Sequence, residues 1–342
     1  MTRVPVGVVG ASGFLGGELI RLLVAHPEIE LAMLCGARSA GQKIGALRPS
    51  LAALPHVVEA VNAEALAARC EVVFCAMPHG ESATLTAELL ALHETVRVID
   101  LGSDFRLRDP AGYPRYYGRQ HPHPELLEQA FYALPELTGG APREARIIAN
   151  PGCFATALAL GITPLAAAMK TSARIAISGV TGSSGSGAAP GPGVHHALRL
   201  TNLRAYKPLA HQHLGELRQT LREVAQNEVA VDFVPHSGPM ARGIHLTMHI
   251  RRNELEGDAL SLLEAAYAKS ALVQVQQGPV AMGAVLGSCR VEIGVAQDAE
   301  AIVVFVAIDN LLKGGSGQAL QNLNLWLGLE ETLGLPLCGV WP

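Results

Sequence analysis

The feature that most constrains the fold is a glycine-rich turn between two apolar runs near the start of the chain. Residues 4–10 read VPVGVVG, residues 10–17 read GASGFLGG, and ELIRLLVAHP follows with helical spacing. The first run predicts a buried parallel strand. A strand, a glycine turn and a helix in this order direct backbone N–H groups toward a pyrophosphate. We therefore expect an α/β domain that binds a dinucleotide.

The glycine spacing differs from the usual GxGxxG pattern. Gly7, Gly10, Gly13 and Gly16 give GxxGxxGxxG. A glycine turn alone is weak evidence, because a tight strand-to-helix connection needs no ligand. The flanking strand and helix favour a cofactor site, and we predict cofactor contacts from the turn and the first helical residues: Gly10, Ala11, Ser12, Gly13, Phe14 and Leu15.

The second expected strand, IELAMLCGARSAG at 29–41, indicates which cofactor binds. An NAD site usually has Asp or Glu at this strand end for the ribose 2′-hydroxyl. Here the end carries Arg38 and Ser39, and no acid lies between Leu31 and Gly41. Arginine suits a 2′-phosphate, so the pattern favours NADP. The alternative is an ordinary solvent-exposed loop arginine.

Three further runs extend the pattern toward a doubly wound sheet: EVVFCAMPHG (71–80), TVRVIDLGSDF (95–105) and ARIIANPGC (145–153). Loops after parallel strands form the site in such sheets, so Pro78 is expected at the cofactor. His79 and Asp104 are expected to point toward the crevice or to shape its loops. A short-chain dehydrogenase is excluded, because none of the six tyrosines has a lysine four residues on.

Cys153 stands in an unusual place, in the stretch IIANPGCFATALALGITPL at 147–165. It follows a Pro-Gly pair and begins a long apolar run. One interpretation is a small buried hydrophobe. The other is a nucleophile, since a helix N-terminus lowers a thiol pKa and offers N–H groups to an oxyanion.

The second half of the chain predicts a mixed sheet and a histidine-rich segment. Residues 173–193 begin as a strand and become a Gly/Ser loop, which is either a flexible linker or a phosphate-binding loop. His211 and His213 precede an amphipathic helix. They are a metal pair or, more simply, partners of Cys153. No acidic or cysteine cluster accompanies them, so we expect no metal. Further strands are expected at 243–252, 289–295 and 301–310, then a sharp turn at Gly314–Gly315 and a final helix.

Bulk properties exclude several classes of partner. The net charge is −4, which gives no electrostatic case for nucleic acid or an anionic membrane. No run reaches the ~18 uncharged apolar residues of a membrane span, and the start of the chain has no secretory pattern. The six cysteines show no CxxC spacing. They fit a reducing cytoplasm.

These motifs together resemble the N-acetyl-γ-glutamyl-phosphate reductase family, which is related to aspartate-semialdehyde and glyceraldehyde-phosphate dehydrogenases. The motifs that carry the resemblance span residues 10 to 325: GASGFLGGEL, DLGSDFRLRDP, NPGCFATA, KPLAHQHLGEL and AIDNLLKGGSGQALQN. The resemblance implies a Rossmann-type NADP-binding domain at 1–152, completed by a helix returning within 311–342. It also implies an α+β substrate and dimerisation domain at 153–310.

The resemblance also implies roles for residues. Cys153 would be the nucleophile and a histidine of the HQH segment the acid/base, for which we favour His213 over His211. NADP would contact the glycine turn, Arg38, Ser39 and the second-half residues Gly182, Ser183 and Asn310. Substrate contacts would come from Ser103, Arg106 and Asn150. The implied assembly is a homodimer or homotetramer.

The implied reaction is NADPH-dependent reduction of N-acetyl-γ-glutamyl phosphate to N-acetylglutamate 5-semialdehyde, through a cysteinyl thioester, in arginine biosynthesis. Alternatives are an N-succinyl-glutamyl, carrier-bound aminoadipyl or aspartyl phosphate. The loop SGVTGSSGSGAAPG lacks the usual family arginine, and Phe154-Ala155 replace the commoner Tyr-Pro. The acyl group, the oligomeric state and the choice between the two histidines stay open. A regulatory NADP-binding protein or a redox sensor using Cys153 are the other classes.

Overall fold

The computed structural model describes residues 3–191 and 194–340, which form two compact units. The first takes the described residues up to Pro135, then Gly139–Pro151 and Gly315–Leu335. The second takes Glu136–Thr138, Gly152–Gly314 and the described residues from Pro336 on. The expected boundary at 152/153 lies next to this division. The returning segment begins later than residue 311, and the last described residues group with the second unit.

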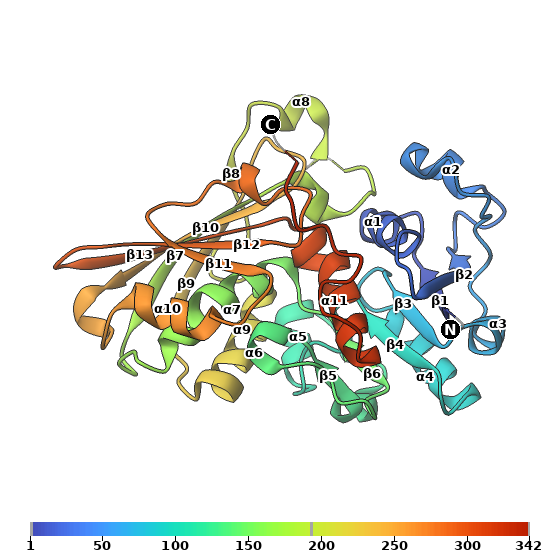
Figure 1. Ribbon diagram of the computed structural model, residues 1–342, viewed down its shortest axis with the longest axis horizontal. Helices are drawn as coiled ribbons and strands as arrows, with labels where there is room; N and C mark the ends of the chain where they lie inside the picture. The colour runs from blue at the N-terminus through green and yellow to red at the C-terminus, as the bar shows by residue number, and fades with distance from the viewer. Residues whose placement is uncertain (1–2, 192–193, 341–342) are drawn as a thin grey trace. The chain divides into compact units, whose positions relative to one another are not determined.

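The first unit is built on a six-stranded sheet in the order β2-β1-β3-β4-β6-β5, with every pair parallel (Figure 1). Its strands are β1 Val4–Val9, β2 Ile29–Cys35, β3 Val72–Cys75, β4 Arg97–Asp100, β5 Ala130–Tyr132 and β6 Ile147–Ala149. β2 and β3 flank β1, so the direction of winding reverses at β1. Ligands of such sheets bind outside the carboxyl ends of the strands at this switch point. The short β5 was not expected from the sequence.

Helices and short turns connect these strands: α1 Phe14–Leu23, α2 Ile44–Leu47, η1 Pro49–Leu51, α3 Ala63–Arg69, α4 Ser82–Leu92, α5 Gly112–Tyr117, η2 Pro124–Gln129 and, at the unit boundary, α6 Pro135–Thr138. Cys35, Cys70 and Cys75 are buried in one apolar cluster with Val9 and Leu66. These three cysteines are therefore core residues of the first unit.

The last helix, α11 (Gly317–Leu327), belongs to the first unit, as expected. The Oγ of Ser316 donates to the carbonyl of Leu15 at 2.8 Å, and Trp326 donates its indole N–H to the carbonyl of Pro142 at 3.1 Å. The sharp turn expected at Gly314–Gly315 was wrong. Residues Leu312–Ser316 form a wide π-helical turn, η8, that continues into α11. A π turn keeps the chain helical, and glycine's missing side chain here serves close packing instead of a reversal.

The second unit is built on a mixed seven-stranded sheet in the order β11-β12-β13-β10-β7-β9-β8. Its strands are β7 Arg174–Thr181, β8 Arg204–Ala205, β9 Ala230–Ser237, β10 Ile244–Arg251, β11 Val273–Gln277, β12 Val291–Gln297 and β13 Ala301–Ile308. Burial alternates along β7 and β10, so one face is covered and the other is open. β8, β9 and β11 were missed in the sequence.

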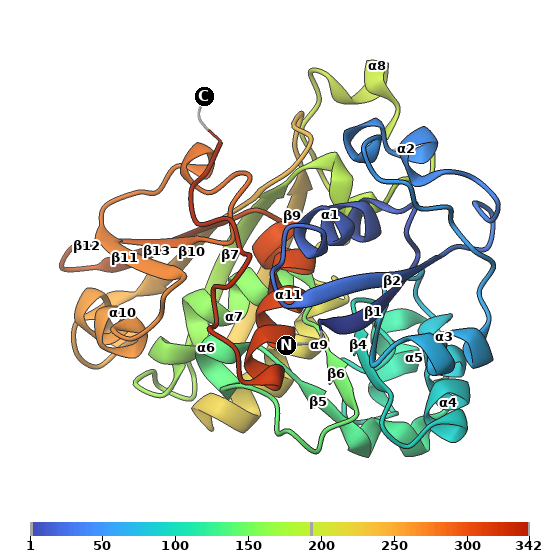
Figure 2. The same ribbon diagram turned by 45° about the vertical axis from the view of Figure 1, so that its right-hand side comes forward.

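The covered face carries α7 (Cys153–Ala166), α9 (His213–Thr220) and α10 (Ala259–Tyr267), as Figures 1 and 2 show. Shorter elements complete the unit: η3 Ser183–Ser186, α8 His196–Arg199, η5 Leu221–Ala225, η6 Arg252–Glu254 and η7 Met282–Ala284. Among residues 3–191 and 194–340, no helix combines the length and apolarity that crossing a membrane requires.

Candidate active site

The glycine turn after β1 is shaped by close backbone contacts. Gly10 has φ +88°, and a Cβ there would lie 2.2 Å from the carbonyl oxygen of Ala76. A Cβ on Gly16 would lie 2.2 Å from the carbonyl oxygen of Gly10. No side chain can therefore stand at Gly10 or Gly16, and the first N–H groups of α1 have no intrahelical partners. The turn is a backbone cradle that fits the pyrophosphate of a dinucleotide.

Arg38 and Ser39 lie in the loop after β2. In a nucleotide-binding fold this loop neighbours the glycine turn that follows β1. Arg38 is exposed, whereas Ser39 is 4% exposed and its Oγ has no hydrogen-bond partner among the described residues. The segment 36–48 holds three cations and no Asp or Glu. An unpartnered hydroxyl and uncompensated positive charge fit a phosphate at this strand end.

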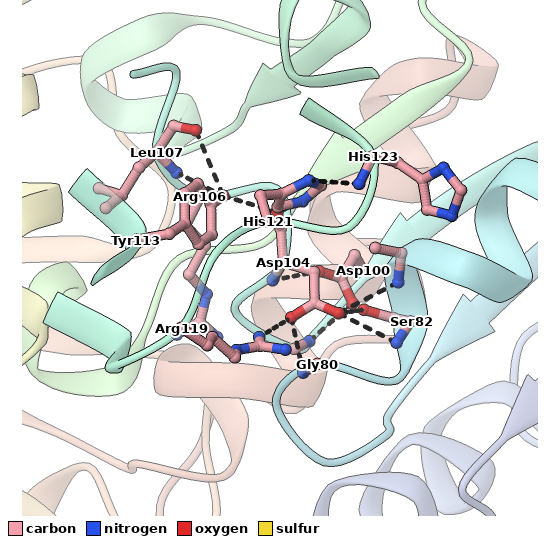
Figure 3. Close-up of polar contacts among 12 residues, drawn as sticks. Gly80, Ser82, Asp100, Asp104, Arg106, Leu107, Tyr113, Arg119, His121 and His123 are labelled. Carbon is pink, nitrogen blue, oxygen red and sulfur yellow. Dashed lines mark hydrogen bonds and ion pairs between the residues drawn. The ribbon is translucent and has the colours of Figure 1, made fainter. Parts of the chain in front are cut away.

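Asp104 is the centre of a buried polar network after β3 and β4 (Figure 3). Its side chain is fully buried and accepts four hydrogen bonds from the start of α4: the N–H groups of Gly80, Ser82 and Ala83 at 2.8, 3.1 and 3.1 Å, and the Oγ of Ser82 at 3.0 Å. Arg119 adds an ion pair at 2.5 Å. Asp104 thus shapes a loop, which was one of its two expected roles.

This network fixes the loop that contains Pro78 and His79. Both residues are exposed, and the ring of His79 lies 6.0 Å from that of Tyr117. The N–H group of Gly80 donates a hydrogen bond to Asp104, and this bond fixes the end of the loop at the switch point. Pro78 therefore lies in a fixed loop at the carboxyl end of β3, where a dinucleotide would bind.

The carboxyl groups of Asp100 and Asp104 lie close together in this network. Burial raises the pKa of Asp100 to about 6, and the negative charge of Asp104 adds to the rise. Burial also raises the pKa of Asp104, but the N–H donors of Gly80 and Ala83 and the Arg119 guanidinium outweigh it, so this pKa lies below its ordinary value. Asp104 is thus the more acidic carboxyl group of the two.

Ser103, Arg106 and Asn150, expected at the substrate, lie together in the first unit and are buried. Arg106 donates to the carbonyls of Asn150 and Leu101, each at 2.9 Å. The side chain of Asn150 donates to the carbonyl of Gly315 and accepts from Asn322. These bonds indicate that Arg106 and Asn150 position their segments. The Oγ of Ser103 has no hydrogen-bond partner within the described part of the chain.

Cys153 is the first residue of α7 and is partly exposed, unlike the buried Cys35, Cys70, Cys75 and Cys289. The N-cap is Gly152, and no side chain caps the helix. The N–H groups of the first turn and the helix dipole therefore lie at the thiol. Gly314 backs the site, since a Cβ there would lie 2.8 Å from the Cβ of Cys153. The buried pair of Lys313 and Glu136, 2.6 Å apart, anchors that turn.

His213 lies against the segment that leads into Cys153. A Cβ on Gly152 would lie 2.4 Å from the Nε2 of His213, so the glycine before the thiol makes room for the imidazole. Glu216 is fully buried, one turn on from His213 in α9. Its Oε2 accepts the Gly152 N–H at 2.8 Å, and its Oε1 lies 3.9 Å from His213 Nε2. One carboxylate thus holds both the entrance to α7 and the imidazole.

His211 occupies a different environment. Its ring is packed edge-on against the rings of Phe154, His213, Tyr206 and Phe233. Burial lowers the pKa of His211 to about 4, and the charge of Lys207 adds to the fall. Its Nδ1 accepts the backbone N–H of His213 at 3.3 Å. His211 is therefore neutral at physiological pH, and it helps to position His213.

The loop after β7 is also built by internal bonds. Gly182 donates to the carbonyl of Gly243 at 3.1 Å, and the Ser183 Oγ donates to the carbonyl of Met240 at 3.2 Å. Asn310 accepts from the N–H of Gly243 and donates to the Oγ of Ser184. The amide of Asn310 therefore fixes the loop that contains Gly182 and Ser183. In the described residues, no group of three or more His, Cys, Asp or Glu is placed to hold a metal ion.

Two residues of the site were missed in the sequence. Glu216 follows His213 by three residues in KPLAHQHLGEL, a spacing that puts both on one face of a helix. That signal was available. Tyr206 had none, because only folding brings its ring 5.8 Å from that of His211. Burial raises the pKa of Tyr206, and the charge of Cys153 adds to the rise, so the phenol stays protonated at neutral pH.

We expect Glu216→Gln to lower kcat by about a hundredfold, since a small misplacement of a catalytic group costs this much. The amide cannot stabilise an imidazolium, so the acid limb of the pH–rate profile should also move to lower pH. Steady-state kinetics from pH 5 to pH 9 measure both effects. Glu228→Gln, which changes an exposed ion pair with Arg222 in the same unit, is the matched control. An unchanged profile in Glu216→Gln would contradict the assigned role.

Comparison with known proteins agrees with these features. Residues 5–145 match the family described as "Semialdehyde dehydrogenase, NAD binding domain" and residues 153–310 match "Semialdehyde dehydrogenase, dimerisation domain". Aspartate semialdehyde dehydrogenase II from Vibrio cholerae shares the fold, with a TM-score of 0.68 at 16% identity over 96% of this chain and 99% of that one. The enzyme from Candida albicans, solved with NADP, gives 0.65 at 15% identity over 97% and 100%.

Closer relatives align over nearly their full length. A protein of Ectopseudomonas mendocina is 40% identical over 99% of this chain and 100% of its own. One of Azotobacter vinelandii is 40% identical over 98% and 99%, respectively. Both are named N-acetyl-gamma-glutamyl-phosphate reductase. With its glycine turn and its cysteine–histidine site built in the matched regions, the chain belongs to the N-acetyl-gamma-glutamyl-phosphate reductase family of semialdehyde dehydrogenases.

Proposed function

We propose that the chain reduces N-acetyl-γ-glutamyl phosphate to N-acetylglutamate 5-semialdehyde with NADPH and releases inorganic phosphate, a step of arginine biosynthesis. The names of its full-length relatives support this substrate. The observation that carries the chemistry is the partly exposed Cys153 at the start of α7, with His213 packed against Gly152. A thiol, an imidazole and a helix N-terminus together suit acyl transfer.

In the first half-reaction, His213 takes the proton of the Cys153 thiol. The thiolate attacks the carbonyl carbon of the acyl phosphate, the C–S bond forms, and the C–O bond to phosphate breaks. The product is a thioester on Cys153. The N–H groups of the first turn of α7 stabilise the tetrahedral oxyanion, an effect often worth about 3 kcal/mol per donor.

In the second half-reaction, the thioester carbonyl would accept the hydride that NADPH supplies when bound. The same N–H groups bind the second oxyanion on the Cys153 adduct. The C–S bond then breaks, which releases the aldehyde, and the imidazolium of His213 returns its proton to the sulfur. Glu216 stabilises that imidazolium from 3.9 Å away and keeps the ring beside the thiol.

The cofactor would be held by the turn Gly10–Leu15, by Arg38 and Ser39, by Pro78 and by the loop of Gly182 and Ser183. In this proposal Asn310 acts by fixing that loop, since its amide is bonded to Gly243 and Ser184. Ser103 remains a candidate for substrate contact. Arg106 and Asn150 act as positioning residues, because their polar groups bond within the first unit.

We also propose that the chain works as a homodimer or homotetramer in the cytoplasm. The second unit matches a family described as a dimerisation domain, and one face of its sheet is open. None of the six cysteines, all within the described residues, forms a disulfide, and the proposed nucleophile needs its thiol reduced. A reducing compartment provides that condition.

The test is a panel of aldehydes in the reverse direction, with phosphate and either NADP or NAD. We expect N-acetylglutamate 5-semialdehyde with NADP to give the highest kcat/KM. Aspartate semialdehyde should be at least ~100-fold poorer, because a site built to bond polar groups rejects analogues that lack them. The N-succinyl aldehyde and the longer aminoadipate semialdehyde complete the panel. Reduction of the nucleotide, followed at its absorbance band, measures each rate.

Cys153→Ala protein gives the background rate for every pair. A preference for aspartate or aminoadipate semialdehyde would overturn the proposed substrate while keeping the reaction class. A protein that binds NADP but oxidises none of the aldehydes would overturn the proposed function altogether.

A further inference from the structure

The side chain of Arg48 contacts the glycine turn. It follows α2 in the chain, and its guanidinium donates to the carbonyl of Ser12. The same group lies 5.2 Å from the centroid of the Phe14 ring, in a cation–π contact. A Cβ on Gly17 would lie 3.3 Å from its Nε, so the glycine leaves space for it. A long and flexible side chain is thus held at the residues that form the cofactor turn.

The positive charge of Arg48 is not compensated by a carboxylate among the described residues. Arg48 has no ion pair there, and its buried Nε has no hydrogen-bond partner within residues 3–191 and 194–340. The whole segment 36–48 also lacks Asp and Glu. A partly buried guanidinium without an anion is costly, and a bound dianion would remove that cost.

The place of Arg48 indicates which anion this is. In a nucleotide fold the pyrophosphate lies on the N–H groups of the glycine turn, and the group on the ribose 2′ position lies near the end of the second strand. Arg48 comes from the segment after that strand and contacts the turn at the carbonyl of Ser12 instead of at an N–H group. The pyrophosphate is therefore not its natural partner. Because Arg48 joins the glycine turn to the segment after the second strand, its place fits contact with a 2′-phosphate.

We propose that Arg48 acts with Arg38 and Ser39 to bind the 2′-phosphate of NADPH, and so sets the preference for NADPH over NADH. The inference rests on the NADPH use proposed above. Stacking on Phe14 and the bond to Ser12 hold the guanidinium plane in place. A preorganised fork gives more affinity for phosphate than a mobile surface cation, because less side-chain entropy is lost on binding.

The experiment measures binding without catalysis. Isothermal titration compares 2′,5′-ADP, which carries the 2′-phosphate, with 5′-AMP, which lacks it, on the full chain. Arg48→Met keeps the length of the side chain and removes the charge. We expect it to weaken 2′,5′-ADP binding about tenfold or more and to leave 5′-AMP within about twofold, since its base and 5′-phosphate contacts stay. Arg48→Lys keeps the charge without the fork and should fall between the two proteins.

Arg97→Met is the matched control. Arg97 also stacks on an aromatic ring, 4.9 Å from that of Trp326, but it begins β4 at the edge of the sheet opposite the carboxyl ends. Its substitution should change neither affinity. Retained 5′-AMP binding shows that each variant is folded.

Three results would overturn the role of Arg48: an unchanged affinity of Arg48→Met for 2′,5′-ADP, equal weakening of both nucleotides, or a wild-type protein without preference for the 2′-phosphate. Failure of the proposed function has a different signature. Wild-type protein that prefers 2′,5′-ADP but acts on none of the aldehydes contradicts the reaction and leaves Arg48 as the 2′-phosphate residue.

Discussion

Cys153→Ser is expected to lower kcat for acyl-phosphate reduction roughly ten-thousandfold or more, the scale seen when a catalytic nucleophile is removed. A serine hydroxyl at a helix N-terminus stays protonated at neutral pH, so it is a poor nucleophile there. Binding of NADPH, measured by its fluorescence, should change less than about twofold, since the glycine turn is untouched. The loss should therefore appear in kcat and not in cofactor affinity.

Cys338→Ser is the matched control for this experiment. Cys338 is the other cysteine with solvent access among the described residues, and it is exposed near the end of the chain. Its substitution should leave kcat unchanged. Iodoacetamide should inactivate wild-type protein and Cys338→Ser equally, with the label found on Cys153. Near-normal turnover by Cys153→Ser would contradict a reaction through a thioester on Cys153.

His213→Asn is expected to lower kcat between about a hundredfold and ten-thousandfold, the usual contribution of a general acid/base. His213 Nε2 is packed against Gly152, the residue before Cys153, and lies 3.9 Å from Glu216. The pH dependence should change as well, because the group that takes the thiol proton is gone. A profile of kcat/KM from pH 5 to pH 9 should lose the limb that wild-type protein shows.

His211→Asn is the matched comparison, since it changes the same residue type two positions away. Burial lowers the pKa of His211 to about 4, so the ring is neutral throughout that range and is not the titrating group. We expect a loss of about tenfold or less, from weaker packing around His213, and an unchanged profile. If His211→Asn abolished turnover while His213→Asn kept it, the two assignments would be exchanged.

Much of the first unit could be predicted from the sequence because the signals that specify it are local. The run at 4–10, the glycine turn and the helix after it lie within one strand-turn-helix element, and the structure has β1 and α1 there. Strand ends were less accurate. The run 71–80 is a strand only over Val72–Cys75. Beyond it the loop is held by Asp104, a contact 24 residues from Gly80 that no local pattern predicts.

The sequence placed Cys153 at the start of a helix, because a Pro-Gly pair followed by helix-forming residues fixes that start locally. It did not show what surrounds the thiol. Gly152 and Glu216 are joined by a hydrogen bond across 64 residues, and the π turn at Gly314 comes from much further along the chain. Arg48 likewise meets Ser12 across 36 residues.

The sequence by itself therefore determined the nucleotide fold, the position of the reactive thiol at a helix start and the two histidines beside one helix. Only the tertiary structure decided that His213 faces Gly152, that Glu216 supports it and that His211 is enclosed by aromatic rings. Local patterns act through backbone propensity and hydrophobic period, which a few neighbouring residues set. The site depends on contacts between distant segments, whose partners are chosen by the packing of the whole unit.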